Sequence, residues 1–118
     1  MFEKIIAMSL LFDFYGQLLT IKQQEILIMY YNDNYTLVEI AKELGVSRQA
    51  VYDSMKKAEK ILYDYEDKLG LTNKFQETNE AVGKINGFIE KALSSPAMDN
   101  SLRKELMEIK AIIDKLND

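Results

Sequence analysis

The side chains best suited to specific chemistry in this sequence lie between residues 47 and 60. Arg48 and Gln49 are of the residue types that make paired hydrogen bonds to guanine and adenine in the major groove of DNA. Tyr52 is suited to contact a thymine methyl group or a phosphate, and Ser47 can hold a phosphate at a helix N-terminus. The lysines that follow are suited to neutralise phosphate charge. The candidate DNA-binding residues are therefore Ser47, Arg48, Gln49, Tyr52, Lys56, Lys57 and Lys60.

The charge distribution is compatible with this interpretation. The chain carries a net charge of −4, yet residues 47–60 hold four basic and two acidic side chains and are the only positive part. Asp53 lies among the candidate contacts, where it either accepts a hydrogen bond from cytosine or weakens binding. The contrast is modest, and Arg, Gln and Lys on a helix are most often ordinary solvated surface. DNA binding is nevertheless the favoured interpretation.

Catalytic and metal-binding chemistry has few candidate residues. His and Cys are both absent, so the sequence lacks the usual general base, the usual metal ligands and any disulfide. It has no glycine-rich phosphate loop and no nucleophile elbow. Asp64, Glu66 and Asp67 cluster, but a charge run at a helix end is usually solvated. We therefore expect a protein that is not an enzyme and that binds neither a cofactor nor a metal.

Two capped helices are predicted to precede the candidate contacts. Thr20 with Gln23, and Thr36 with Glu39, have the spacing of capping boxes, in which side chain and backbone at a helix start bond reciprocally. The first pattern predicts a helix over about residues 21–31. The second predicts a short helix that Gly45 ends.

The helix that carries the candidate contacts is expected to be long. Ser47 is its predicted N-cap and Gly70 its predicted C-cap, giving a length of about 33 Å. Its apolar side chains recur in steps of three and four, at Val51, Met55, Ala58, Leu62, Tyr65 and Leu69. Together with the preceding helix it has the pattern of a helix-turn-helix. The residues expected to hold the two helices together are Ile40, Ala41, Leu44, Val46 and Val51.

The remaining segments complete an all-α fold. Residues 2–19 are predicted to form an apolar helix that is buried on two sides. A further helix is expected to start at Thr72 or Asn73 and to end before Ser94-Ser95-Pro96. We predict a helix-turn-helix domain over residues 1–71 and a C-terminal helical extension over residues 72–118.

The last predicted helix carries a row of apolar residues at heptad-like spacing, at Leu102, Leu106, Ile109, Ile113 and Leu116. This row predicts a homodimer, and the alternative is that it packs within the chain. The short apolar run near the N-terminus lacks the features of a signal peptide, and no run is long enough to span a membrane. We therefore expect a cytoplasmic protein that does not associate with membranes.

Residues 18–62 resemble region 4 of bacterial sigma factors, a helix-turn-helix without a wing, through the segment TLVEIAKELGVSRQAVY. The chain is more closely similar to the YlxM family of small bacterial helix-turn-helix proteins. That similarity rests on LFDFY at 11–15, LLTxKQ at 18–23, MYY at 29–31, EIA at 39–41, VSRQAVYD at 46–53 and YExKL at 65–69.

The resemblance implies a DNA-binding protein that regulates transcription. Genes of the YlxM family tend to neighbour that of the signal-recognition-particle GTPase, so the resemblance also implies a link to the signal recognition particle pathway. The alternative function is therefore an accessory protein that binds the RNA or the GTPase of that particle. Duplex RNA, however, hides its major groove from a helix. The chain shows no second module that would melt a promoter, so we do not expect a sigma factor.

Overall fold

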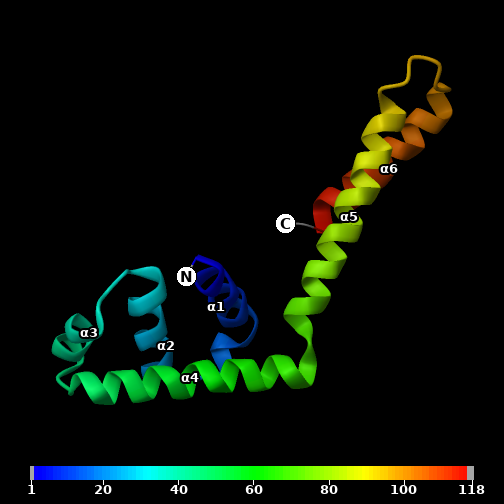
Figure 1. The fold of residues 1–118 in the computed structure, drawn as a ribbon. Coiled ribbons are helices and arrows are strands. Elements are labelled where there is room, and N and C mark those ends of the chain that lie inside the picture. Colours follow the sequence, from blue (N-terminus) through cyan, green and yellow to red (C-terminus); the bar gives the residue numbers. More distant parts are fainter. Residues whose placement is uncertain (1, 117–118) are drawn as a thin grey trace. The chain divides into compact units, whose positions relative to one another are not determined.

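The computed structural model describes residues 2–116, which fold into α-helices joined by short turns (Figure 1). No strand occurs in this part of the chain, and the predicted all-α fold is confirmed. None of the described helices is long and apolar enough to cross a membrane. In chain order the helices are α1 (Phe2–Tyr15), α2 (Ile21–Leu27), α3 (Leu37–Leu44), α4 (Arg48–Leu69), α5 (Leu71–Leu93) and α6 (Asn100–Leu116).

The helices fall into two compact units, Met1–Thr72 and Asn73–Asp118. The first unit contains α1 to α4 and the first two residues of α5. The second contains the rest of α5 and α6.

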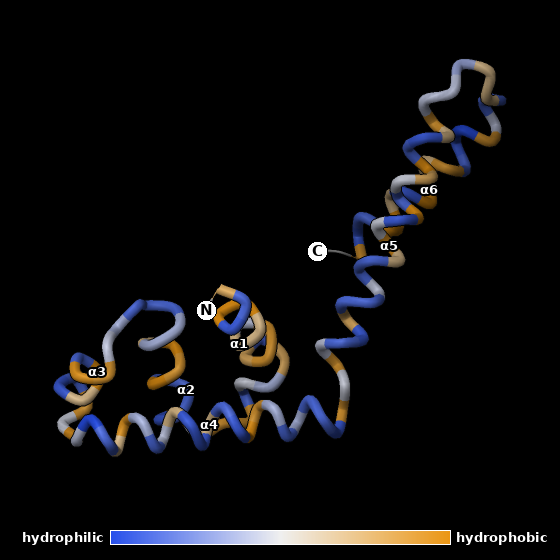
Figure 2. Tube along the Cα trace, viewed as in Figure 1, coloured by the Kyte–Doolittle hydropathy of each residue, from blue (hydrophilic) through white to orange (hydrophobic). Residues whose placement is uncertain are grey.

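The core of the first unit lies where α1, α2 and α3 pack along one side of α4 (Figure 1). In the predicted apolar stripe of α4, Val51, Ala58 and Leu62 are fully buried. Leu69, at its end, is 55% exposed, because the other helices of this unit do not cover the last turn of α4. Figure 2 shows hydrophobic stretches of α1 and α2 beside those of α4. Burying one Leu, Ile or Met side chain contributes about 1.5–3 kcal/mol. The largest side chains with almost no exposed surface are Tyr15, Met8, Ile26, Ile40, Leu62 and Val51.

Both predicted capping boxes are present. The Thr20 side chain accepts a hydrogen bond from the Gln23 backbone N–H (3.2 Å), and the Gln23 side chain accepts one from the Thr20 N–H (3.0 Å). Thr36 and Glu39 exchange the same pair of bonds at 3.1 Å each. The starts of α2 and α3 therefore follow from the local sequence, because each box satisfies backbone donors that a helix start leaves free.

Two helices end earlier than predicted. The N-terminal helix was expected to reach residue 19, but α1 ends at Tyr15, where the 3₁₀ turn Gly16–Leu18 begins. The second was expected to reach Tyr31, but α2 ends at Leu27 and continues as the π-helical turn Ile28–Asn32. There the Asp33 N–H bonds to the carbonyl of Ile28 at 3.0 Å. Capping patterns mark where these helices start, whereas no local pattern marks the change to i→i+5 bonding.

The helix predicted to start at Thr72 or Asn73 begins instead at Leu71. The Tyr15 hydroxyl donates to Glu66 Oε1 (2.6 Å) and accepts from the Leu71 N–H (3.1 Å). The same carboxylate oxygen accepts from the Thr72 N–H (3.0 Å). Tyr15 and Glu66 thus satisfy the first donors of α5, so the helix needs no Thr or Asn cap of its own. Burial and the hydrogen bond to Glu66 raise the pKa of Tyr15 above its ordinary value.

The second unit is an antiparallel hairpin of α5 and α6 (Figure 1). Arg103 donates to the carbonyls of Leu93 (2.6 Å) and Ser95 (2.9 Å). Lys110 Nζ lies 3.3 Å from Glu90 Oε1. These contacts fix the turn and set α5 beside α6.

The predicted apolar row of α6 is divided in the structure. Ile113 is buried and Leu106 is half-buried. The other members, Leu102, Ile109 and Leu116, are 47%, 44% and 74% exposed. The hairpin therefore covers part of the row, and homodimerisation through it stays a prediction.

Candidate nucleic-acid interface

The turn between α3 and α4 has the geometry that its sequence predicts. Gly45 adopts a left-handed conformation (φ 66°), which other residues adopt at a cost. The N–H groups of Gly45 and Val46 both bond to the Ala41 carbonyl and so end α3. Ser47 Oγ then accepts from the Ala50 N–H at 3.0 Å and starts α4. A tight turn thus joins two well-defined helices, as a helix-turn-helix requires.

The inward faces of α3 and α4 hold the two helices together. Ile40 and Val51 have no exposed surface, and Ala41 is 8% exposed. Leu44 and Val46 are half-buried at the turn. The residues predicted to build the helix-turn-helix therefore do so, and Ile40, Ala41 and Val51 are unavailable to a ligand.

The outward face of the first turns of α4 carries the candidate base contacts. Arg48, Gln49 and Tyr52 are all exposed. Gln49 Nε2 donates to Asp53 Oδ1 at 2.9 Å. Asp53 therefore has a role that the sequence analysis missed, since it holds the Gln49 amide in one orientation. The i,i+4 spacing of two polar residues on an exposed helix face is the signal that indicates such a pair.

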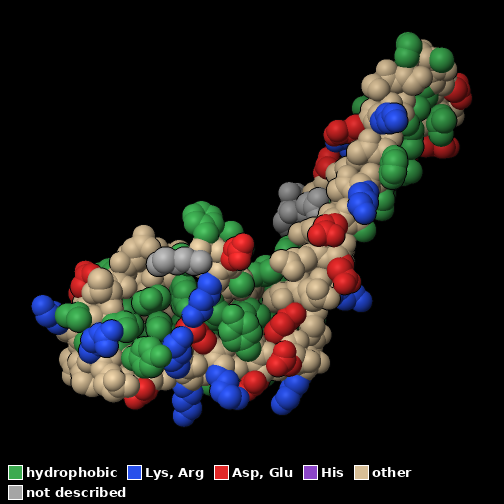
Figure 3. Space-filling model, viewed as in Figure 1, with side chains coloured by type: hydrophobic (Ala, Val, Ile, Leu, Met, Phe, Trp, Pro, Cys, Tyr) green, Lys and Arg blue, Asp and Glu red, His purple; other side chains and the backbone are tan. Residues whose placement is uncertain are grey.

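The candidate phosphate contacts differ in what already binds them. Lys56 Nζ lies 3.6 Å from Glu59 Oε1 and 5.6 Å from the centre of the Tyr52 ring. Lys60 Nζ lies 2.9 Å from Asp64 Oδ2. The Lys60–Asp64 pair is exposed, and such pairs are worth about 0–1 kcal/mol, so a phosphate can displace it. The Lys56–Glu59 pair differs, because the Glu59 side chain is buried. Lys57 is also exposed. Figure 3 shows basic and acidic side chains mixed along the α4 edge of the first unit.

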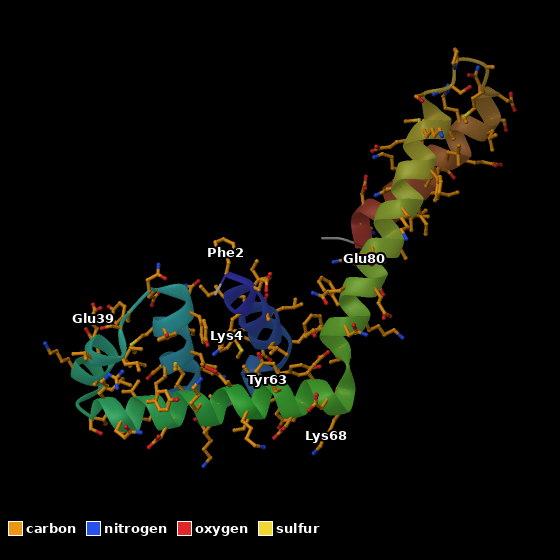
Figure 4. The ribbon with its side chains drawn as sticks, viewed as in Figure 1. Phe2, Lys4, Glu39, Tyr63, Lys68 and Glu80 are labelled. Carbon is orange, nitrogen blue, oxygen red and sulfur yellow. The ribbon has the colours of Figure 1, made fainter. Side chains whose placement is uncertain are left out.

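A buried carboxylate stabilises α4 behind this face. Glu59 is 5% exposed and accepts a hydrogen bond from the Tyr31 hydroxyl (2.9 Å). Lys4 Nζ lies 3.4 Å from its other oxygen, and Figure 4 shows Lys4 between α1 and α4. Burial opposes the charge of Lys4, but Glu59 outweighs it and raises the Lys4 pKa. Desolvation and the bond to Glu59 raise the pKa of Tyr31. The cluster ties α1 and the π-helical turn to α4.

Arg48 also borders a cavity of about 560 Å³ that the sequence analysis did not anticipate. Lys4 of α1 and Tyr35, just before α3, line the same cavity. Nothing in local spacing places residues 4 and 35 beside residue 48, so only the fold could identify them. The remaining lining residues are Ile5, Tyr30, Tyr31, Asn34, Thr36, Leu37 and Val38.

Comparison with known proteins extends the similarity over almost the whole chain. The family model described as "UPF0122: Putative helix-turn-helix protein, YlxM / p13 like" matches residues 2–108. A UPF0122 protein of Bacillus thuringiensis (strain Al Hakam) is 43% identical over 117 residues, which cover 99% of this chain and all of the relative. The UPF0122 protein lwe1821 of Listeria welshimeri is 42% identical over 112 residues, which cover 95% of this chain and 99% of the relative.

Proposed function

This chain belongs to the UPF0122 family of YlxM / p13-like helix-turn-helix proteins, and we propose that it binds duplex DNA in a sequence-dependent manner. The observation that carries the proposal is the exposure of Arg48, Gln49 and Tyr52 in the first turns of α4, while Val51 is buried in the core. A helix presented in this way fits the major groove, in which every base pair has a distinct pattern of donors and acceptors.

Each exposed side chain has a separate role in the proposed complex. Arg48 and Gln49 bond to base edges, and each such paired contact is worth about 1–3 kcal/mol of discrimination against a wrong base. Tyr52 contacts a thymine methyl group or a phosphate. Ser47, Lys56 and Lys57 bind phosphates, and Lys60 exchanges its partner Asp64 for a phosphate.

We further propose that binding regulates transcription by occupying sites in DNA. The signal-recognition-particle link of the sequence analysis rests on family resemblance, and no contact among residues 2–116 favours it over DNA. A helix does not enter the deep, narrow major groove of duplex RNA. Binding of the chain to the RNA of that particle should therefore be measured beside its binding to duplex DNA, as the comparison that separates the two functions.

A selection from random duplex DNA with the full chain at moderate salt tests the proposal. We expect an enriched sequence motif that Arg48→Ala abolishes. Lys68→Ala is the matched control, because it also removes one positive charge from α4, in the last turn of the helix (Figure 4). Lys68→Ala should keep the motif. Absence of any motif, together with tight binding to signal-recognition-particle RNA or its GTPase, would overturn the proposal in favour of the alternative.

A further inference from the structure

The hairpin of the second unit has little core of its own. Among its described residues only Ile89 and Ile113 are buried, one from each helix. Units of this size that lack disulfides and metals usually need oligomerisation to be stable, because they bury too little apolar surface. Two helices also form a single layer, whereas a stable core needs a second layer packed against the first.

Each helix of the hairpin carries a row that faces its neighbour and a second, exposed apolar row. On α5 the inner row is Val82, Asn86, Ile89 and Leu93, and on α6 it is Arg103, Leu106, Lys110 and Ile113. The exposed row of α5 is Ala81, Ile85 and Phe88, with the half-buried Ala92 at its end. The exposed row of α6 is Leu102, Glu105, Ile109, Ile112 and Leu116.

Both exposed rows lie on the same side of the hairpin. In each helix the exposed row precedes the inner row by one residue, which is a rotation of about 100° in the same sense. Because α5 and α6 run antiparallel, equal rotations turn both rows toward one side. We call this side the apolar face of the hairpin. Figure 3 shows hydrophobic side chains gathered along one flank of this unit.

The apolar face is large enough to be one half of a stable interface. Six of its large side chains are 44% to 74% exposed, and Phe88, at 72%, is among the most exposed. At about 150 Å² for each fully exposed side chain, they present on the order of 500 Å² of apolar surface. With a polar rim this approaches the roughly 800 Å² that each partner buries in a standard interface. The six side chains are Ile85, Phe88, Leu102, Ile109, Ile112 and Leu116.

We propose that this face binds the same face of a second copy of the chain, so that two hairpins form a four-helix bundle. A twofold axis parallel to the helices keeps every residue at its own level and lays α5 of one copy on α6 of the other. The row of α5, which begins and ends with the small Ala81 and Ala92, then meets the row of large side chains on α6. The two alanines leave room for large side chains of α6, while Ile85 and Phe88 fill the centre of the interface.

The charged residues at the face fit the same arrangement. Glu105 interrupts the exposed row of α6, and Lys91 lies on the outer edge of α5. The contacts of Arg103 with Leu93 and of Lys110 with Glu90 place Glu105 and Lys91 at about the same level of the hairpin. The twofold axis therefore brings Lys91 of each copy near Glu105 of the other. A second copy thus supplies both the apolar layer and an opposite charge for the acid within it.

The oligomeric state of the full chain without nucleic acid tests this proposal, and the result does not depend on DNA binding. Sedimentation equilibrium over a wide concentration range should give twice the chain mass for the unmodified protein. Phe88→Glu and Ile112→Glu should give monomers, because each buries a charge against an apolar partner. Met107→Glu is the matched control, since Met107 is 58% exposed but lies on the other side of α6, and it should leave the dimer intact.

Phe88→Ala keeps the measurement informative if a glutamate variant fails to fold, because Ala favours the helix. It should raise the dimer dissociation constant about tenfold or more, as loss of a central aromatic contact does. A monomer at every concentration of the unmodified chain would overturn the proposal. So would dissociation by Met107→Glu as strong as that by Phe88→Glu.

Discussion

The long helices α4 and α5 have almost the same length, 22 and 23 residues, yet they differ in what they bury. α4 buries Val51, Ala58 and Leu62 completely, because three other helices pack against it. Of the part of α5 that lies in the second unit, Ile89 is the only buried residue among those described, because α6 alone packs beside it there. Apolar periodicity thus predicts that a helix has a face to bury, whereas the number of neighbouring helices determines how much of it is buried.

The largest expected difference between the units is in the unfolding free energy that is lost when one apolar side chain in each unit is replaced by alanine. Leu62→Ala should lower the free energy of unfolding by about 2–5 kcal/mol, because Leu62 has no exposed surface and its loss leaves a cavity. Met107→Ala should cost about 1 kcal/mol or less, because Met107 is 58% exposed and lies outside the apolar face of the hairpin. Urea denaturation followed by circular dichroism measures both. Equal losses would contradict the assignment of the core to the first unit.

The hydrogen bonds at the junction of α4 and α5 should contribute a smaller effect. Tyr15→Phe removes the hydroxyl that donates to Glu66 and accepts from the Leu71 N–H, which should cost about 1–3 kcal/mol. Tyr63→Phe is the control, because Tyr63 is 43% exposed on the same helix as Glu66 (Figure 4). It should change the thermal midpoint little. A Tyr15→Phe protein as stable as the control would mean that these bonds do not stabilise the start of α5.

The sequence predicted the parts of this fold that depend on neighbouring residues. The starts at Thr20, Thr36 and Ser47 and the left-handed glycine at residue 45 follow from caps and turns, whose partners lie within a few residues. The exposed face of α4 followed from helical spacing alone. These local signals were sufficient to predict the helix-turn-helix and the candidate contacts on it.

Features that join distant parts of the chain had no such signal. Lys4, Tyr31 and Glu59 meet only because α1, the π-helical turn and α4 converge. The row predicted on α6 is a second example. The spacing correctly predicted which positions of α6 are apolar. It did not predict that Ile113 is buried against α5 while Leu116 is exposed.

Loss of a helix cap should give an effect of about 1 kcal/mol in the first unit. Thr36→Ala removes the acceptor for the Glu39 N–H and should lower the unfolding free energy by about that amount. The comparison in the second unit is Thr78→Ala, at an exposed position within α5, where Ala is the better helix former. Thermal unfolding should therefore show a lower midpoint for the first variant and an unchanged or higher one for the second. A higher thermal midpoint for Thr36→Ala than for Thr78→Ala would show that the Thr36 cap does not contribute to the stability of the first unit.

The pH dependence of stability should show the smallest effect, confined to the first unit. Tyr15 and Tyr31 have raised pKa values in the folded protein, so folding favours their neutral forms. Their contribution is complete below the ordinary value of 10.0 and is lost as the pH rises above it, because the unfolded chain then ionises first. Replacing both by Phe should flatten the loss of stability in urea titrations above that pH. An unchanged slope would contradict the proposed environment of the two hydroxyls.

Specificity and salt dependence on the selected duplex test the function of α4 most directly. Binding by Arg48→Ala should lose discrimination between the selected duplex and a scrambled one by about 1–3 kcal/mol. Lys57→Ala should weaken binding to both duplexes equally and reduce the slope of log affinity against log salt by about 1. Lys68→Ala should change neither property. An Arg48→Ala protein that discriminates as well as Lys68→Ala would show that the exposed face of α4 does not bind DNA bases.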